Sequence, residues 1–528
     1  MTNRVIQALA AELSGRRNTF LKSTKMSAML LALMVVFIFL VSAWFGASGV
    51  RGSDQYWYVA DVESLIDGRG IQTNEIYPVS VRHDVVTSPR LFIHNRLNLY
   101  IVALPALLLG AYNAWIVVNV VSSLLTSVLV FFTVIRVTRS DTIALTTAAA
   151  YLLSPLTFWL TTQPLVEAST APLVALAVHL YVTANAAFWR WALLMLVATL
   201  LAYCHEELVL LLPLIPLAYL LHVRPLHYRR LTGAAGLLAL GGGLWLLGRG
   251  EFEQYLSVTY WHVLTSPAPA DMNWFFDLNP QSLPISAVLA KALKGLEVQF
   301  TRIDTAYLLF YLPFNIVAVA PFIVLLRGAR EEVARVGVAG LVFLALHLIT
   351  VIVVQNQYRY LLMAFPPLLV AVGVSMGRID LFRSNLHLPN AVIFAAVLAF
   401  AAPCWALAWH SHDEGISERD ARENLAIAFN ETMPTTDTVM VAIDLPSGFS
   451  NQLLGYVLRP RPTLYVSERY GADDYAALIN NVHATWLISR RDSPVFEQLA
   501  PAMVREERAL PVPFADWSLF AIQSGPAP

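Results

Sequence analysis

The sequence is poor in charge and in cysteine. Of its 528 residues, only 13% are Asp, Glu, Lys or Arg, about half the share found in soluble globular proteins. Its two cysteines, Cys204 and Cys404, lie in or beside apolar runs and offer neither a disulfide framework nor metal-ligand spacing. No G-x-x-x-x-G-K-[ST] pattern occurs, nor a G-x-G-x-x-G after a strand. These absences argue against a soluble, disulfide-stapled or nucleotide-loop protein, and no nucleic-acid partner is expected.

The chain has long apolar runs instead. Hydrophobic residues make up 57% of it, and runs near 20 residues are typical of membrane-spanning helices. The predicted spans are 26–48, 112–135, 141–161, 165–184, 189–204, 207–222, 231–248, 306–326, 335–354, 359–377 and 388–410. The segment LNLYIVALPALLLG, 97–110, is shorter and more typical of an interfacial helix. The sequence therefore predicts an α-helical polytopic membrane protein with about eleven spans plus interfacial helices.

The distribution of basic residues orients these spans. A basic N-terminus, 1–25, precedes the first run and reads as a cytoplasmic flank of a retained signal anchor. Lys and Arg accumulate in short cytoplasmic loops, and the basic loops fall on the N-terminal side only if 97–110 does not span. These loops are 136–139, 222–230, 327–335 and 378–383. We therefore expect a plasma (inner) membrane protein whose loops 49–111 and 249–305 and whose C-terminal tail are extracytoplasmic.

The tail, residues 411–528, differs in composition from the membrane domain, 26–410. Turn-forming Asp, Pro and Gly residues separate short β-branched runs from helix-like segments. The strand candidates are 438–444, 463–467 and 485–489, and the helix candidates are 454–458 and 473–482. Strands that alternate with helices predict a small C-terminal α/β soluble domain.

An acidic stretch, DQYWYVADVESLIDGRG, begins at Asp54 directly after the first span. On a helix, Asp54, Tyr58 and Asp61 lie on one face, and Ser53 is a suitable N-cap. A carboxylate at Asp54 could serve as a general base or accept a substrate hydroxyl. Alternatively, an acidic first turn stabilises the helix through its dipole. Spacing alone does not decide between these interpretations.

Further polar residues lie at predicted outer turns. Glu167 begins the span 165–184, where an ionisable residue is either functional or a water-exposed acid at a helix start. His205 and Glu206 belong to the turn CHEE, which lacks the second histidine of a zinc motif, so a divalent ion stays an open cofactor. His94, in the first outer loop, either lines a site or is a solvated loop residue.

A cation lies at the predicted outer face as well. Arg359 begins the span RYLLMAFPPLLVAVG at its outer end, against the cytoplasmic bias of basic residues. Arginine suits bidentate phosphate contact at the depth of lipid phosphates, whereas snorkelling from a helix end is the structural alternative. Together with Asp54 and Glu167, Arg359 predicts a cavity at the outer interface that pairs a base with a phosphate binder. The other residues expected in this cavity are Tyr58, Asp61, His94, His205 and Glu206.

The order of these features resembles the GT-C superfamily of integral-membrane glycosyltransferases. The motifs that carry the resemblance are the acidic first loop at Asp54, the interfacial segment 97–110, LLSPLTFWL with Ser154 and Pro155, VEAST with Glu167, and RYLLMAFPPLLV with Arg359. The resemblance implies a sugar donor carried on a polyprenyl phosphate. It also implies that Asp54 is the catalytic base and that Arg359 neutralises the donor phosphate.

The sequence thus favours a glycosyltransferase that moves a sugar from a polyprenyl-phosphate donor to a lipid, glycan or protein acceptor at the outer membrane face. One alternative is a non-enzymatic transporter or flippase of lipid-linked saccharides. Such proteins place substrate-binding charges near the bilayer midplane and often contain repeats, whereas these charges lie at the outer edge and no repeat stands out. A scaffold whose tail binds a partner is a third interpretation, and it would tolerate loss of Asp54.

Overall fold

The protein is described from a computed structural model. The described residues are 29, 32–44, 46, 53–70, 75–76, 96–185, 187–222, 228–247, 285–301, 307–327, 330–353, 358–377, 402–403, 406, 410, 424, 428, 441–444, 461, 463–466, 484–490, 492–493, 497, 504–509 and 517–522. The predicted span 388–410 lies almost entirely outside them.

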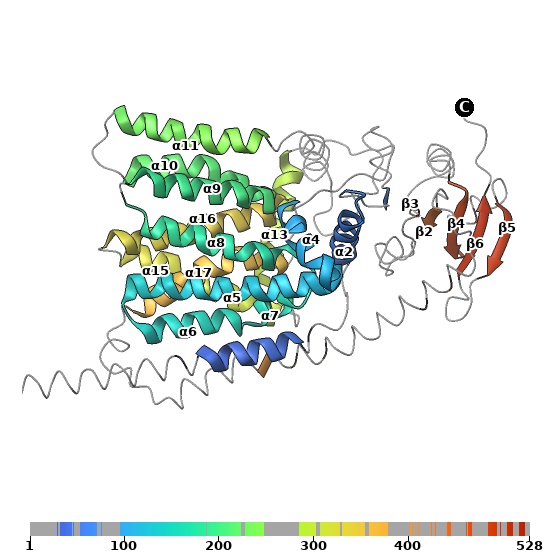
Figure 1. Cartoon of the computed structure of the whole chain (residues 1–528), viewed down its shortest axis with the longest axis horizontal. Coiled ribbons are helices and arrows are strands. Elements are labelled where there is room, and N and C mark those ends of the chain that lie inside the picture. The colour runs from blue at the N-terminus through green and yellow to red at the C-terminus, as the bar shows by residue number, and fades with distance from the viewer. Residues whose placement is uncertain are drawn as a thin grey trace, which may run out of the picture.

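Most described residues belong to a bundle of helices that lie side by side (Figure 1). Its members are α5 (Ala111–Thr138), α6 (Asp141–Leu152), α7 (Pro155–Thr161), α8 (Val166–Thr183), α9 (Phe188–Cys204), α10 (Leu211–His222), α11 (Tyr228–Leu247), α15 (Ala320–Leu326), α16 (Glu331–Val353) and α17 (Leu361–Met376). Within the described part of the chain, six helices are long and apolar enough to cross a membrane, or seven if one bent pair is counted. Four shorter apolar helices accompany them. The total of eleven spans stays a prediction.

One predicted span, 141–161, is broken by a bend. The segment 141–161 is two helices, α6 and α7, bent by 52° at their junction. A proline disfavours helical geometry in the residue before it, and Pro155 is the first residue of α7. Ser154 precedes it in an extended conformation, and its Oγ accepts a hydrogen bond of 3.1 Å from the Thr157 amide. The serine therefore caps the second helix and fixes the bend.

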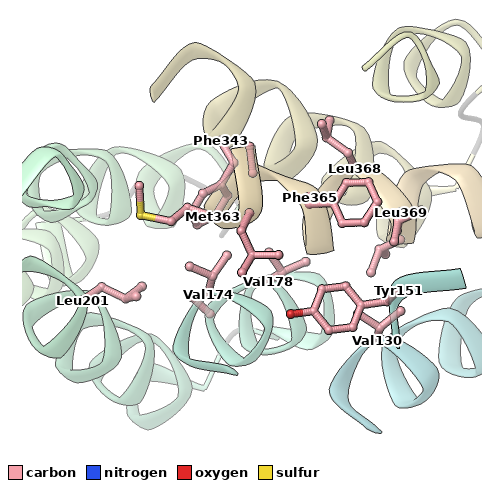
Figure 2. Packing of buried hydrophobic residues seen from close by; sticks show 14 of the residues in the cluster. Val130, Tyr151, Val174, Val178, Leu201, Phe343, Met363, Phe365, Leu368 and Leu369 are labelled. Carbon is pink, nitrogen blue, oxygen red and sulfur yellow. The ribbon is translucent and has the colours of Figure 1, made fainter. Parts of the chain in front are cut away.

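Small and hydroxyl-bearing side chains join the bundle helices. Ser123 of α5 lies 2.7 Å from the Thr161 hydroxyl of α7, and Ser127 donates to the Ala148 carbonyl of α6 at 3.2 Å. Such contacts are expected between helices in lipid, where apolar burial alone drives little association. Larger apolar residues fill the remaining space, and Figure 2 shows Tyr151 of α6 facing Phe365 of α17, with ring centroids 6.2 Å apart.

Short helices gather at one end of the bundle. They are α2 (Ser53–Ile66), α4 (Arg96–Leu109), η1 (Glu206–Leu210), α13 (Ile285–Thr301) and η5 (Tyr358–Tyr360). The elements η4 (Tyr307–Tyr311) and α14 (Leu312–Val317) instead continue into α15 as one candidate span, Tyr307–Leu326. The helix α4 is one of the shorter apolar helices, as the length of 97–110 predicted. Residues 285–301, which the sequence analysis treated as part of an outer loop, form the helix α13. In Figure 1, α2 lies between the bundle and the strands of the tail.

The strands form one six-stranded sheet in the order β1-β3-β2-β4-β6-β5. They are β1 (Glu75–Ile76), β2 (Val441–Asp444), β3 (Thr463–Val466), β4 (Trp486–Arg490), β5 (Val504–Ala509) and β6 (Trp517–Ile522). The three predicted strands correspond to β2, β3 and β4, which pair in parallel, whereas β5 and β6 were not predicted. The predicted helices 454–458 and 473–482 lie outside the described residues, so the α/β character of the tail stays a prediction.

The first strand comes from a different part of the chain. Residues of β1 belong to the predicted outer loop 49–111, and Glu75 pairs in parallel with Thr463 of β3. The loop that begins with α2 and the C-terminal tail therefore share a sheet.

Substitution of Gly373 tests the close packing of the bundle. A Cβ atom on Gly373 of α17 would lie 2.5 Å from the Thr147 hydroxyl and 3.0 Å from a Val134 methyl group, whereas one on Gly243 of α11 would meet nothing within 4 Å. Because overpacking costs roughly 1–3 kcal/mol, we expect Gly373→Ala to lower the free energy of unfolding by about that amount. Gly243→Ala, the matched control, should not lower it. Denaturation of both variants in detergent measures the difference, and equal stabilities would contradict the packing described.

Candidate active site

The start of α2 is held against the turn that precedes α8. Asp54 lies in the first turn of α2 as predicted, although its side chain lies outside the described residues. The neighbouring Gln55 donates from Nε2 to Gln163 Oε1 at 2.7 Å, and both side chains are buried. Further along α2, the Tyr58 carbonyl accepts a hydrogen bond of 3.1 Å from Trp115 Nε1. These bonds place the acidic first turn beside the segment that leads to Glu167.

A buried asparagine shapes that segment. Asn119 of α5 donates from Nδ2 to the carbonyls of Gln163, at 2.7 Å, and Leu165, at 3.0 Å. Backbone carbonyls at membrane depth need such partners because no water is available there. The sequence analysis missed Gln55, Asn119 and Gln163. Two signals could have identified them: an amide within the apolar run 112–135, and glutamines next to the acidic motifs.

An ion pair joins two of the predicted site residues. Arg359 Nε lies 3.4 Å from Glu167 Oε1, and the side chains are 12% and 1% exposed. Glu167 is in the first turn of α8, and Arg359 is in η5, the short turn before α17. A buried charge costs several kcal/mol unless it is paired, so the two helix starts are held together. The second carboxylate oxygen, Oε2, is buried and has no hydrogen-bond partner among the described residues.

Tyr360 extends this pair to a third predicted residue. Arg359 Nη2 donates to the Tyr360 hydroxyl at 3.0 Å, and the guanidinium carbon lies 4.9 Å from the tyrosine ring centroid. The buried His205 ring packs edge-on against Tyr360, with centroids 5.8 Å apart. The structure thus brings Glu167, Arg359 and His205 together around Tyr360, whose part in the site the sequence analysis did not anticipate.

The remaining predicted residues divide into two groups. Tyr58 and Asp61 are buried in α2, and the Tyr58 ring packs against Trp115 with centroids 5.7 Å apart. His94 and the side chain of Glu206 lie outside the described residues. Across the described part of the chain, no three His, Cys, Asp or Glu side chains are grouped so as to hold a metal ion.

Three aromatic side chains, from α7, η4 and η5, contact one another beside the ion pair. Trp159 Nε1 of α7 donates to the Tyr358 hydroxyl at 3.2 Å, and the Tyr358 ring stacks on Phe310 of η4 with centroids 5.0 Å apart. Tyr358 directly precedes Arg359 in η5. A guanidinium beside aromatic surface can bind an anionic group attached to an apolar chain.

The chain shares its fold with solved structures of membrane glycosyltransferases, and its apolar helices support a multi-pass membrane protein. Among solved structures, ArnT from Cupriavidus metallidurans in the apo state is similar, with a TM-score of 0.57 and 13% identity over 94% of this chain and 99% of that chain. The structure of ArnT bound to undecaprenyl phosphate is also similar, with a TM-score of 0.55 and 12% identity over 93% of this chain and 97% of that chain.

An oligosaccharyltransferase from Archaeoglobus fulgidus in the apo form shares the fold as well. Its TM-score is 0.50 and its identity 11%, over 88% of this chain and 69% of that chain. No protein-family model matches the sequence, and no curated protein does. The likeness is therefore one of fold, carried by structure and not by sequence.

A double-mutant cycle on Glu167 and Arg359 tests whether their contact stabilises the site. Because the pair is largely buried, we expect Glu167→Ala and Arg359→Ala to couple by about 1–3 kcal/mol in unfolding free energy. The control is Arg136 with Glu332, a pair 3.7 Å apart whose side chains are 64% and 45% exposed; it should couple by about 0.5 kcal/mol or less. Denaturation of the single and double variants gives both values. Equal coupling in the two cycles would show that the buried pair stabilises the fold no more than the exposed pair does.

Proposed function

We propose that the protein is a glycosyltransferase that moves a sugar from a polyprenyl-phosphate donor to an acceptor at the outer face of the plasma membrane. The observation that carries this proposal is the buried contact between Arg359 and Glu167 at two helix starts, within a GT-C fold. One similar structure, ArnT, was solved with undecaprenyl phosphate bound, which supports a lipid-phosphate donor here.

The ion pair suits reversible phosphate binding. Arg359 Nε lies 3.4 Å from the Glu167 carboxylate, which is longer than a short charge-assisted hydrogen bond. A donor phosphate can compete with Glu167 for this guanidinium, because its two non-bridging oxygens match the planar fork of donors that arginine presents. Glu167 would then hold Arg359 in place before the donor arrives. The aromatic surface formed by Trp159 and Tyr358 would contact the first isoprene units or the sugar.

The transfer forms a bond between the acceptor oxygen and the sugar and breaks the bond between the sugar and the phosphate. Asp54 removes the proton from the acceptor hydroxyl, whose oxygen attacks the anomeric carbon of the donor sugar. The bond between that carbon and the phosphate oxygen breaks, and the polyprenyl phosphate leaves with its negative charge. Arg359 stabilises this charge as it develops. Attack opposite the leaving phosphate inverts the anomeric centre. Gln55 and Gln163 act as positioning residues, because their hydrogen bond links the first turn of α2 to the segment before Glu167.

The position of the charges favours transfer over transport. Transporters bind substrate near the bilayer midplane, at helices that are interrupted there. Glu167 and Arg359 lie instead at the first turns of their helices, where we expect the lipid headgroups. A flippase of lipid-linked saccharides is the second candidate, and it would not need a general base.

Asp54→Asn tests the base. Because general acid–base catalysis contributes roughly 10²–10⁴-fold, we expect transfer from a polyprenyl-phosphate sugar to fall by about that factor while donor binding is kept. The control is Asp67→Asn, which changes an exposed aspartate just beyond the other end of α2 and should keep full activity. The measurement is sugar transfer by purified protein in vesicles. Full activity of the Asp54 variant would remove this residue from the mechanism, and sugar-lipid translocation without transfer would favour the flippase.

Arg359→Ala tests the phosphate contact. Loss of the guanidinium removes a charge-assisted contact worth about 1.5–3 kcal/mol, so we expect the KM for the lipid donor to rise at least tenfold. The KM for the acceptor should change little. Arg359→Lys keeps the charge without the planar fork and should fall between the two. Steady-state kinetics with each substrate varied in turn separates these effects. A KM change confined to the acceptor would contradict the assignment.

A further inference from the structure

A cavity lies in the bundle, outside the candidate active site. Its volume is about 280 Å³, and α8, α9, α10 and α16 line it almost entirely with apolar side chains. Val178 and Phe343, two of these residues, are labelled in Figure 2. An apolar cavity of about 150 Å³ stays dry and takes up benzene. A cavity nearly twice that size, between helices that face lipid, is suited to a hydrocarbon chain.

The cavity lies toward the opposite end of the bundle from Arg359. Glu167, which pairs with Arg359, begins α8, whereas the lining residue Tyr181 is near the end of the same helix. Fourteen residues of helix separate the two by about 21 Å along the axis. The lining runs along α10 from Leu211 to His222, so the cavity extends along the bundle and ends away from the candidate active site.

The polar residues of the lining lie at that far end. His222 Nε2 and the Tyr181 hydroxyl are 2.7 Å apart, and both residues line the cavity. Behind them, the buried Arg335 donates from Nη1 to the carbonyls of Tyr181 and Ala184 at the end of α8, and from Nη2 to the Glu331 carboxylate. The same carboxylate lies 3.9 Å from His222 Nδ1. The cavity thus runs from an apolar interior to a polar end next to a buried arginine.

This end of the bundle is rich in positive charge. Among the described side chains there, arginines outnumber acids: Arg136, Arg139, Arg190, Arg230, Arg327, Arg330 and Arg335 face only Asp141, Glu331 and Glu332. Arg230 Nη1 is buried and has no hydrogen-bond partner among the described residues. Basic pockets between membrane helices are suited to anionic lipid headgroups.

We infer that this cavity binds one hydrocarbon chain of an anionic glycerophospholipid, whose phosphate lies among the arginines at this end of the bundle. The depth and apolar lining suit the chain, and the excess of arginine suits the phosphate. The polyprenyl donor of the proposed function differs in that its phosphate would lie at Arg359. The lipid site depends on neither the donor nor the transfer reaction, and it holds if the protein proves to be a flippase.

The test uses the full chain in nanodiscs that contain phosphatidylglycerol with a photoactivatable diazirine in one acyl chain. After illumination, peptide mass spectrometry locates the label. We expect label on the lining residues of α8, α10 and α16. Ala218→Leu, which fills the cavity from α10, should reduce this label several-fold. Ala239→Leu adds the same atoms to an exposed position of α11 and should leave the label unchanged.

Further measurements distinguish the possible occupants. Leu214→Ala enlarges the cavity and should increase the amount of label on the lining residues. This variant tests whether the cavity holds a lipid chain if Ala218→Leu does not fold. Equal labelling by a phosphatidylcholine probe with the same chains would overturn the anionic headgroup. Displacement of the label by undecaprenyl phosphate, but not by unlabelled phosphatidylglycerol, would assign the cavity to an isoprenoid instead. Label that is unchanged in a folded Ala218→Leu variant would show that the cavity holds no lipid chain.

Discussion

The burial of one carboxylate and one guanidinium constrains the arrangement of the site. Glu167 is almost fully buried, and Arg359 nearly so. Neither charge is tolerable in that environment without the other, so the first turn of α8 and the turn that begins α17 must meet. Once they meet, Tyr360 and His205 complete the surroundings of the arginine. The second oxygen of Glu167 has no hydrogen-bond partner among the described residues, which is a costly feature that a purely structural ion pair does not need.

Amide side chains then fix the neighbouring segments to this point. Asn119 satisfies two carbonyls of the turn before α8, and Gln163 of the same turn bonds Gln55 in α2. The first outer segment is anchored a second time, because β1 pairs with β3 of the tail. The helix that carries Asp54 is therefore tied both to the bundle and, through the loop that follows it, to the C-terminal sheet. Attachment at two points suits the base that we propose for Asp54, because such a group must keep its position between two substrates.

Polar and charged side chains concentrate at the two ends of the bundle, and the two ends differ in which residues they carry. Helices in lipid associate through small residues and hydroxyl contacts, as between Ser123 and Thr161, so polar chemistry concentrates at the helix ends. One end carries the ion pair and aromatic residues, and the other carries most of the described arginines and an apolar cavity. From the positive-inside tendency we expect the arginine-rich end to face the cytoplasm. In that orientation, the proposed transfer takes place at the opposite face of the membrane from these arginines.

Sequence alone determined the helical class, the bounds of most bundle helices and the three strands β2 to β4, because hydrophobic length and periodicity are local properties. It also singled out Glu167 and Arg359, since charges at the ends of apolar runs are rare. Only the tertiary structure decided that these two side chains meet, because their contact joins helices far apart in the chain. The same holds for Gln55 with Gln163, for Asn119 and for Tyr360, whose partners are set by packing. The bend at Ser154, signalled by Pro155, and the strand β1, too short to show periodicity, likewise required the folded chain.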